Sequence, residues 1–175
     1  MQQLQHLNAY VILDSLLSLF FAFVLGTAIG FERQLRQRTA GLRTNALVAI
    51  AAAAFVDLGL QLQGNDGARY IVGYVVSGVG FLGAGAIMKE GANITGLNTA
   101  ATLWGSAAVG AMCGADFLVQ AALVTAFVLA ANTLLRRLVL YINTRPTNTD
   151  ATESNYHLYV VCERATLSQT MAHLQ

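Results

Sequence analysis

Charged residues are scarce in this sequence, and their scarcity excludes an ordinary water-soluble domain. Asp, Glu, Lys and Arg together make up 11% of the 175 residues, whereas a soluble domain usually has about 25%. Hydrophobic residues make up 55%, and the mean hydropathy is +0.55. The few charges leave long windows with none, and these windows cannot supply a water-facing surface. Lipid is therefore the expected solvent for most of the chain.

Cysteine and histidine are too sparse to build the sites in which they usually take part. Cys113 falls in an apolar segment and Cys162 near the C-terminus, and both are predicted to be free thiols. The three histidines lack the spacing of metal ligands. No nucleophile–base pair appears, so neither an enzyme nor a cofactor is predicted. A formal net charge of +1 gives no indication of a nucleic-acid partner.

Five segments of the sequence are predicted to cross the membrane as helices. A span needs roughly 20 mainly apolar residues, and the candidates are about 10–31, 44–60, 70–88, 97–112 and 117–135. The first is expected to be retained, because the residues before Tyr10 lack the basic start of a signal peptide. Helices are predicted because no barrel-like alternation appears. Residues 1–140 thus form an expected all-α transmembrane domain.

The positive charges predict how these segments are oriented. Eight basic residues fall on one side: Arg33, Arg36, Arg38, Arg43, Lys89, Arg136, Arg137 and Arg145. The other side has a single arginine, Arg69, with Asp57, Asp66 and Asp116. Basic loops mark the cytoplasmic side of a membrane protein. The N-terminus is therefore predicted outside the membrane and the C-terminus in the cytoplasm.

Beyond the fifth segment the composition becomes polar. Residues 141–155 are predicted to be a linker, and 156–175 to hold a strand followed by the first turns of a helix. One strand and a partial helix cannot bury a core of their own. Residues 156–175 are therefore either the start of a larger cytoplasmic domain or a mobile tail.

Small residues indicate where the helices approach one another, because close backbone contact drives helix association in lipid. The GxxxG pairs Gly26–Gly30 and Gly110–Gly114 are predicted packing sites, and the second pair is an alternative site for a homodimer. The third segment is denser in small residues: Gly73, Ser77, Gly78, Gly80, Gly83 and Gly85. Tight packing is favoured there over a hinge or a substrate path lined by backbone.

Polar residues near the cytoplasmic ends of the segments are the candidate functional residues. A carboxylate at a helix C-terminus is disfavoured unless it is paired, so Glu32 is predicted to pair with Arg43 or Arg33, with simple solvation as the alternative. Thr95 or Asn98 is predicted to cap the fourth segment. The polar side chains of that segment are expected to face the bundle interior. Asn93 is either functional or a plain turn residue.

Two carboxylates near the outer side, Asp14 and Asp57, are weak candidates for a metal site. Facing each other, they would suit a hydrated magnesium ion, which prefers oxygen ligands. The alternative is that both are interfacial carboxylates that reach water. No ionisable residue falls near the middle of a predicted span, which counts against a pump or a proton-coupled carrier.

Two ordered motifs make this sequence resemble the MgtC/SapB family of bacterial membrane proteins, close to its MgtC branch. The first motif comprises Gly30, Glu32, Arg33, Gln34 and Gly41-Leu42-Arg43-Thr44. The second comprises Gly80-Phe81-Leu82-Gly83-Ala84-Gly85, Gly91 and Gly96-Leu97-Asn98-Thr99-Ala100-Ala101-Thr102-Leu103-Trp104. Asn93 also matches, whereas Gly105 stands where close relatives carry cysteine. The resemblance covers about residues 16–140.

The resemblance implies a non-enzymatic regulator in the bacterial inner membrane, linked to growth in low magnesium and to survival inside macrophages. It implies restraint of another membrane complex, the F-type ATP synthase, and a small cytoplasmic ACT-like α+β domain at the C-terminus. The alternative function is a magnesium channel or carrier, motivated by Asp14, Asp57 and the glycine-rich third segment.

Overall fold

The computed structural model describes residues 9–144. The predicted strand and partial helix at 156–175, most of the predicted linker and Cys162 lie outside the described residues. The chain divides into two units, Met1–Val139 and Leu140–Gln175, and only residues 140–144 of the second are described.

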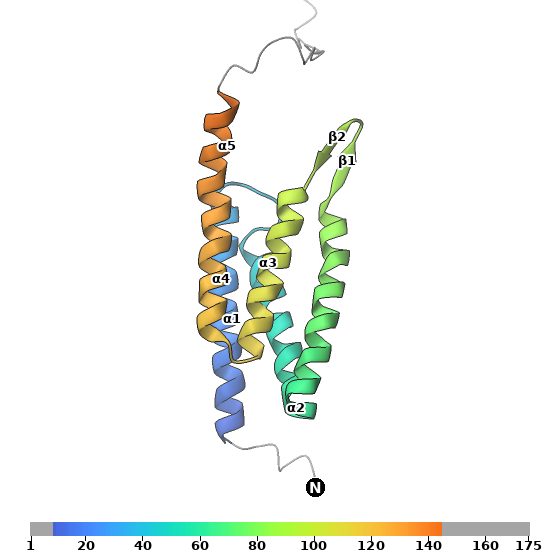
Figure 1. The fold of residues 1–175 in the computed structure, drawn as a ribbon, viewed down its shortest axis with the longest axis vertical. Coiled ribbons are helices and arrows are strands. Elements are labelled where there is room, and N and C mark those ends of the chain that lie inside the picture. The colour runs from blue at the N-terminus through green and yellow to red at the C-terminus, as the bar shows by residue number, and fades with distance from the viewer. Residues whose placement is uncertain (1–8, 145–175) are drawn as a thin grey trace, which may run out of the picture. The chain divides into compact units, whose positions relative to one another are not determined.

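Helices dominate the described residues (Figure 1). The elements are α1 (Ala9–Leu35), α2 (Leu42–Ala86), β1 (Met88–Glu90), β2 (Asn93–Thr95), α3 (Leu97–Gly114), α4 (Leu118–Ala130), the π-helical turn η2 (Ala131–Leu135) and α5 (Arg136–Asn143). Three helical segments are long and apolar enough to cross a membrane, namely Ala9–Leu35, Leu42–Ala86 and Leu118–Asn143. The last of these runs past residue 135, the predicted end of the fifth span.

Helix α2 reverses direction within its 45 residues. Gln63 (φ −138°, ψ 18°) and Gly64 (φ 61°, ψ −147°) leave the helical conformation, and the positive φ of Gly64 suits glycine alone. The reversal gives a first limb, residues 42–62, and a second limb, residues 65–86, which lie side by side (Figure 1). The limbs touch at two glycines, since a Cβ on Gly59 would lie 2.9 Å from the carbonyl oxygen of Gly67.

A short antiparallel hairpin joins α2 to α3. Strand β1 pairs with β2 so that Met88 faces Thr95 and Lys89 faces Ile94, and Gly91 at the turn has a φ of 61°. The prediction of an exclusively α-helical region is therefore wrong at these residues. Gly96 precedes α3 with a φ of 89° and no side-chain cap, so the predicted capping by Thr95 or Asn98 is also wrong.

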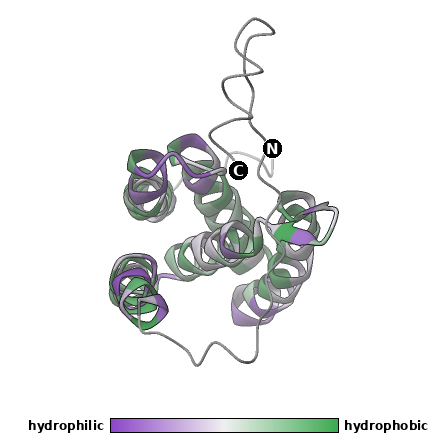
Figure 2. Ribbon diagram, turned by 90° about the horizontal axis from the view of Figure 1, so that it is seen from above, coloured by the Kyte–Doolittle hydropathy of each residue, from purple (hydrophilic) through white to green (hydrophobic). Residues whose placement is uncertain are grey.

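Helix α3 is the central element of the bundle and packs against α1, α2 and α4. Most of the buried residues at these contacts are small: the cluster consists of Ala22, Ala49, Ala53, Val109, Cys113 and Ala121 together with the larger Ile29. Large apolar side chains lie outside instead, with Phe20, Phe81 and Phe127 exposed by 57%, 82% and 74%. Viewed end-on, the helices are hydrophobic over much of their length (Figure 2). Small residues inside and large apolar residues outside are typical of helices packed in lipid.

The two ends of the bundle hold different connections between the helices (Figure 1). The hairpin end holds the 36–41 loop between α1 and α2, together with β1 and β2. The kink end holds Gln63–Gly64 and the 115–117 turn between α3 and α4. The candidate site lies toward the hairpin end.

Candidate functional site

A buried arginine joins three parts of the chain at the hairpin end. Arg33, in the last turn of α1, is 3% exposed. Its Nη2 donates hydrogen bonds to Thr99 Oγ1 of α3 at 2.6 Å and to the carbonyl oxygen of Thr39 at 3.2 Å. The hydroxyls of Thr39 and Thr99 are also 3.0 Å apart. We call the cluster formed by Arg33, Thr39, Asn45, Thr99 and Ser106 the polar junction.

The second half of the polar junction fixes the start of α2. The side-chain amide of Asn45 is completely buried and donates to the carbonyl oxygens of Ala40 and Gly41, at 2.6 and 2.9 Å. Its oxygen accepts a hydrogen bond from Ser106 Oγ at 2.8 Å. The 36–41 loop is thus tied to α3, and Ala40 within it has an unusual positive φ of 55°.

Three polar side-chain atoms of α1, one of them in the polar junction, lack a hydrogen-bond partner among the described residues. Arg33 Nε, Glu32 Oε2 and Thr27 Oγ1 are buried without a hydrogen-bond partner among them. A buried polar atom normally has a partner, because its desolvation is otherwise uncompensated. This end of α1 therefore departs from ordinary packing, and such departures are more common where residues serve a function than where they only fill space.

Glu32, in the last turn of α1, forms its ion pair with the first residue after that helix. Its carboxylate pairs with the Nε of Arg36, one turn later, and the two side chains are 11% and 30% exposed. The predicted pairing with Arg43 or Arg33 is therefore wrong. The prediction chose a partner across the loop, whereas the i, i+4 spacing of Glu32 and Arg36 already brings them together where α1 ends.

A second polar cluster connects α3 to the π-helical turn. Asn98 Nδ2 donates to Asn132 Oδ1 at 3.4 Å, and Asn132 Nδ2 donates to Thr102 Oγ1 at 3.4 Å. Thr102 in turn donates to the carbonyl oxygen of Asn98 at 2.8 Å. Sequence reasoning missed Asn132, although an amide inside the fifth apolar segment is itself a signal. A single π turn often marks a functional position in a helix.

The remaining predicted functional residues are dispersed. Asn93 lies on the exposed hairpin opposite Glu90, and Trp104, 55% exposed, donates to the carbonyl oxygen of Val76 at 3.5 Å. Gly83 lies 3.5 Å, by its Cβ position, from Ala100. Four further predicted residues are exposed and make no contact of this kind with another helix: Gln34, Arg43, Thr44 and Gly85. The structure thus brings Arg33 and Thr99 together, but not Asn93 or Trp104.

The glycines divide into packed and open positions. A Cβ on Gly26 would lie 2.7 Å from Ala49 Cβ, and one on Gly30 would lie 2.6 Å from Leu42 Cα. Gly110 and Gly114 lie equally close to the backbone of Ala49 and Ala53 in α2. This GxxxG pair therefore packs within the chain and is not open to a second copy, as the homodimer alternative would require. Gly78 and Gly80 have open space at their Cβ positions. Packing within the described chain therefore does not explain Gly78 and Gly80, contrary to the prediction.

The carboxylates at the kink end line a hollow but do not form a metal centre. Asp14 and Asp57 both border a hollow of about 540 Å³. Gln61 Nε2 donates to both oxygens of Asp57 at 3.0 Å and to Ser15 Oγ at 2.9 Å. Within residues 9–144, no three His, Cys, Asp or Glu side chains are grouped so as to hold a metal ion. The two carboxylates share one hollow, but they lack a third ligand of this kind.

Asp116 is another carboxylate near this end. It lies in the turn between α3 and α4 with a φ of 64°, and it accepts a hydrogen bond from the buried Ser18 Oγ of α1 at 3.2 Å. Burial raises the pKa of Asp116, and the negative charges of Asp14 and Asp57 raise it further, while the hydrogen bond from Ser18 opposes the shift. The three acidic residues therefore repel one another when all are ionised.

The fold and the polar junction define a mostly helical protein of membrane character, in which a few buried polar side chains link the helices. Within that class, the chain belongs to the MgtC family, whose model matches residues 19–140.

Known proteins similar to this chain support the same assignment. Protein MgtC of Brucella abortus is 48% identical over 153 residues, covering 87% of this chain and 64% of the relative. Protein MgtC of Salmonella typhi is 50% identical over 149 residues, covering 85% and 64%. An uncharacterized protein of Synechocystis is also 50% identical, with the same coverage. The chain thus spans just under two thirds of the length of these relatives. No solved structure matches it significantly.

Proposed function

We propose that this chain is a bacterial inner-membrane regulator of the MgtC type, which binds and restrains another membrane complex such as the F-type ATP synthase. In this proposal it supports growth in low magnesium and survival inside macrophages. The observation that carries the proposal is membership of the MgtC family over residues 19–140. The two motifs at Gly30–Thr44 and Gly80–Trp104 lie inside that match.

The proposed topology has five membrane crossings, made by α1, the two limbs of α2, α3 and the continuous helix from α4 to α5. Three observations support it: the reversal of α2 at Gly64, the burial of α3 among the other helices, and the large apolar side chains exposed on the outside. We propose that the hairpin end faces the cytoplasm, a proposal supported by the basic residues of the 36–41 loop and of α5 and by the positive-inside rule. The N-terminus would then be periplasmic.

A role without catalysis is supported by how the buried polar side chains are used. Arg33, Asn45 and Thr99 bind other parts of the same chain and hold the 36–41 loop against α3. Such a cluster fixes the shape of the cytoplasmic face that a partner would recognise. We propose that the exposed hairpin with Asn93 belongs to that face.

The experiment is copurification from a mild detergent, followed by proton-driven ATP synthesis in inverted membrane vesicles. The expected result is that the ATP synthase membrane sector copurifies with the chain and that its activity falls when the chain is present. Asn93→Tyr is expected to weaken both effects, since it places a bulky group on the exposed hairpin. Asp66→Tyr is the control, because Asp66 is also exposed (75% of its side chain) but lies near the kink.

The proposed regulator role fails if no association is detected and ATP synthesis is unchanged. Equal loss in Asn93→Tyr and Asp66→Tyr would contradict the assignment of the hairpin while leaving the association itself intact. The two results can therefore be told apart.

A magnesium channel or carrier is the second candidate function. The observation that favours it is that Asp14 and Asp57, from α1 and α2, border the same hollow. Magnesium flux into proteoliposomes containing the purified chain is the direct test. Flux that disappears in Asp14→Asn and Asp57→Asn would support transport, and silent liposomes under a magnesium gradient would dismiss it.

A further inference from the structure

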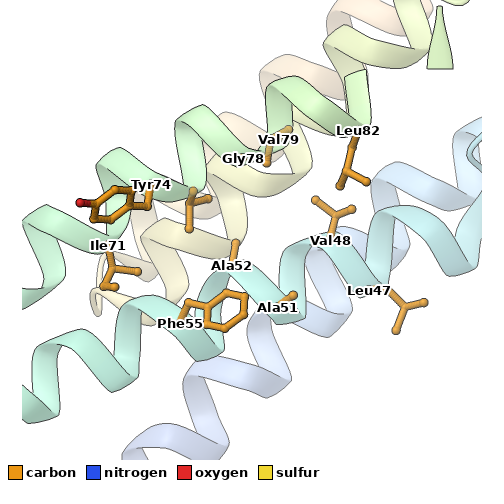
Figure 3. A pocket seen from close by; sticks show the side chains of 11 residues that line it. Leu47, Val48, Ala51, Ala52, Phe55, Ile71, Tyr74, Gly78, Val79 and Leu82 are labelled. Carbon is orange, nitrogen blue, oxygen red and sulfur yellow. The ribbon is translucent and has the colours of Figure 1, made fainter. Parts of the chain in front are cut away.

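The two limbs of α2 leave a lengthwise groove between them that the proposed function does not use. The groove has a volume of about 650 Å³. Leu47, Ala51 and Phe55 line it from the first limb, and Tyr74, Gly78 and Leu82 line it from the second (Figure 3). Apart from the hydroxyl of Tyr74, these side chains are apolar, so the groove is suited to hydrocarbon.

The cross-section of the groove favours a flexible chain over a helix. Small residues line its floor: Ala52 is 4% exposed, and Gly78 has open space at its Cβ position. Its edges are bulky: Leu47, Phe55 and Tyr74 are exposed by 62%, 58% and 72%. Close approach of a transmembrane helix needs small residues at the contact, and bulky edges hold a helix backbone away from the floor. A lipid acyl chain can lie between them.

One end of the groove carries positive charge. Leu47 and Leu82 lie at the same end (Figure 3). Arg43 precedes Leu47 by four residues and so lies on the same face of α2, while Lys89 follows the end of the second limb on β1. Both cations are exposed, no ion pair joins either of them to an acidic side chain that the structure describes, and the first turn of α2 contains no acidic residue. Two cations therefore lie at this end of the groove, with Glu90 as the acidic neighbour of Lys89 in β1.

The apolar groove and its cationic end match the two parts of an acidic phospholipid. From Leu47 to Phe55 the first limb rises about 12 Å, so an acyl chain lying there would extend from the cationic end toward the kink. We propose that this groove binds one anionic phospholipid, with an acyl chain between the limbs of α2 and the phosphate headgroup between Arg43 and Lys89. The proposal does not depend on the identity of any protein partner.

The test uses the full chain purified in mild detergent and stripped of endogenous lipid. Phosphatidylglycerol and phosphatidylcholine are titrated separately, and bound lipid is counted by native mass spectrometry. The wild type is expected to bind one phosphatidylglycerol more tightly than phosphatidylcholine. Each cation near the membrane surface contributes about a fivefold preference for an anionic lipid, so the double variant Arg43→Gln, Lys89→Gln is expected to lose about 30-fold. The double variant Arg136→Gln, Arg137→Gln removes two exposed charges on α5 and controls for net charge.

A second pair of variants tests the groove itself. Gly78→Leu fills the floor without a clash, since its Cβ position is open, and is expected to abolish binding of both lipids. Gly73→Leu is the matched control on the same limb, where the Cβ position is equally open but the residue does not line the groove. Equal retention of the two lipids by the wild type, or equal loss in Gly78→Leu and Gly73→Leu, would overturn the proposal. A chain dimer or a copurifying protein that Gly78→Leu removes while lipid stays bound would also overturn it.

Discussion

Replacing Gly110 by alanine is the sharpest test of how α3 is held in the bundle. A Cβ at Gly110 would overlap the carbonyl oxygen of Ala49 in α2 and would lie 2.7 Å from the carbonyl carbon and Cα of that residue. Comfortable carbon–carbon contacts begin at about 3.5 Å. The two helices must therefore separate locally by about 0.8 Å, because the obstacle is backbone and cannot rotate away.

The magnitude follows from two opposing effects. Overpacking by one methyl group typically costs about 1–3 kcal/mol, and a clash with rigid backbone belongs at the upper end of that range. Alanine is favoured over glycine in a helix by about 1 kcal/mol. Gly110→Ala is thus expected to lower the free energy of unfolding by about 2 kcal/mol.

The assay is unfolding of the purified chain in detergent micelles by a denaturing detergent. Helix content is followed by circular dichroism, and separation of α3 from α2 by the fluorescence of Trp104, the single tryptophan of the chain. Gly80→Ala is the control, because its Cβ position has no neighbour within 4 Å. It is expected to be neutral or more stable by up to about 1 kcal/mol. A Gly110→Ala chain as stable as Gly80→Ala would refute the packing argument.

Three further predictions concern polar groups. Thr99→Val removes the hydroxyl that accepts the 2.6 Å hydrogen bond from Arg33, and is expected to lower the unfolding free energy by about 1.5–3 kcal/mol in the same assay. Ser106→Ala leaves the buried oxygen of Asn45 unpaired, at an expected cost of about 1–3 kcal/mol; a neutral result in either variant would contradict the polar junction. The raised pKa of Asp116 means that the folded state holds its proton more tightly, so stability is expected to fall as pH rises from the ordinary aspartate pKa through the raised value. Unfolding measured across this window should show a weaker pH dependence in Asp116→Asn, and an unchanged dependence would rule out the assignment to Asp116.

Long apolar runs in the sequence indicated helices at the right places because the length of such a run is a direct physical requirement for crossing lipid. The sequence is less informative about which helix face meets a neighbour. Gly26 and Gly80 look alike in sequence, since both lie among small residues in apolar segments. In the structure Gly26 meets Ala49 at 2.7 Å, and Gly80 meets nothing. The difference arises from tertiary arrangement, which a local pattern does not contain.

The candidate site was also only partly predictable. Arg33 and Thr99 stood out as polar residues at the edges of apolar segments, and they lie together although they are 66 residues apart. Asn132 was not predicted as a site residue because its segment is otherwise strongly apolar. The ion pair of Glu32 was assigned to the wrong arginine because partners across a loop were preferred over Arg36, four residues along the chain and directly after α1.

The position of α3 explains how a segment with so many polar groups is accommodated in a protein of this composition. α3 is not among the described helices that are apolar enough to cross a membrane by themselves. Thr99, Thr102 and Ser106 are each at most 5% exposed, and their hydroxyls are bonded to groups in the same chain rather than turned to the outside. Gly110 and Gly114 let α3 approach α2 closely enough for the hydrogen bond from Ser106 to Asn45 to form. The glycines and the hydroxyls therefore act together: the close packing brings Ser106 to Asn45, and without the hydroxyls of Thr99 and Ser106, Arg33 and Asn45 would lose their partners on α3.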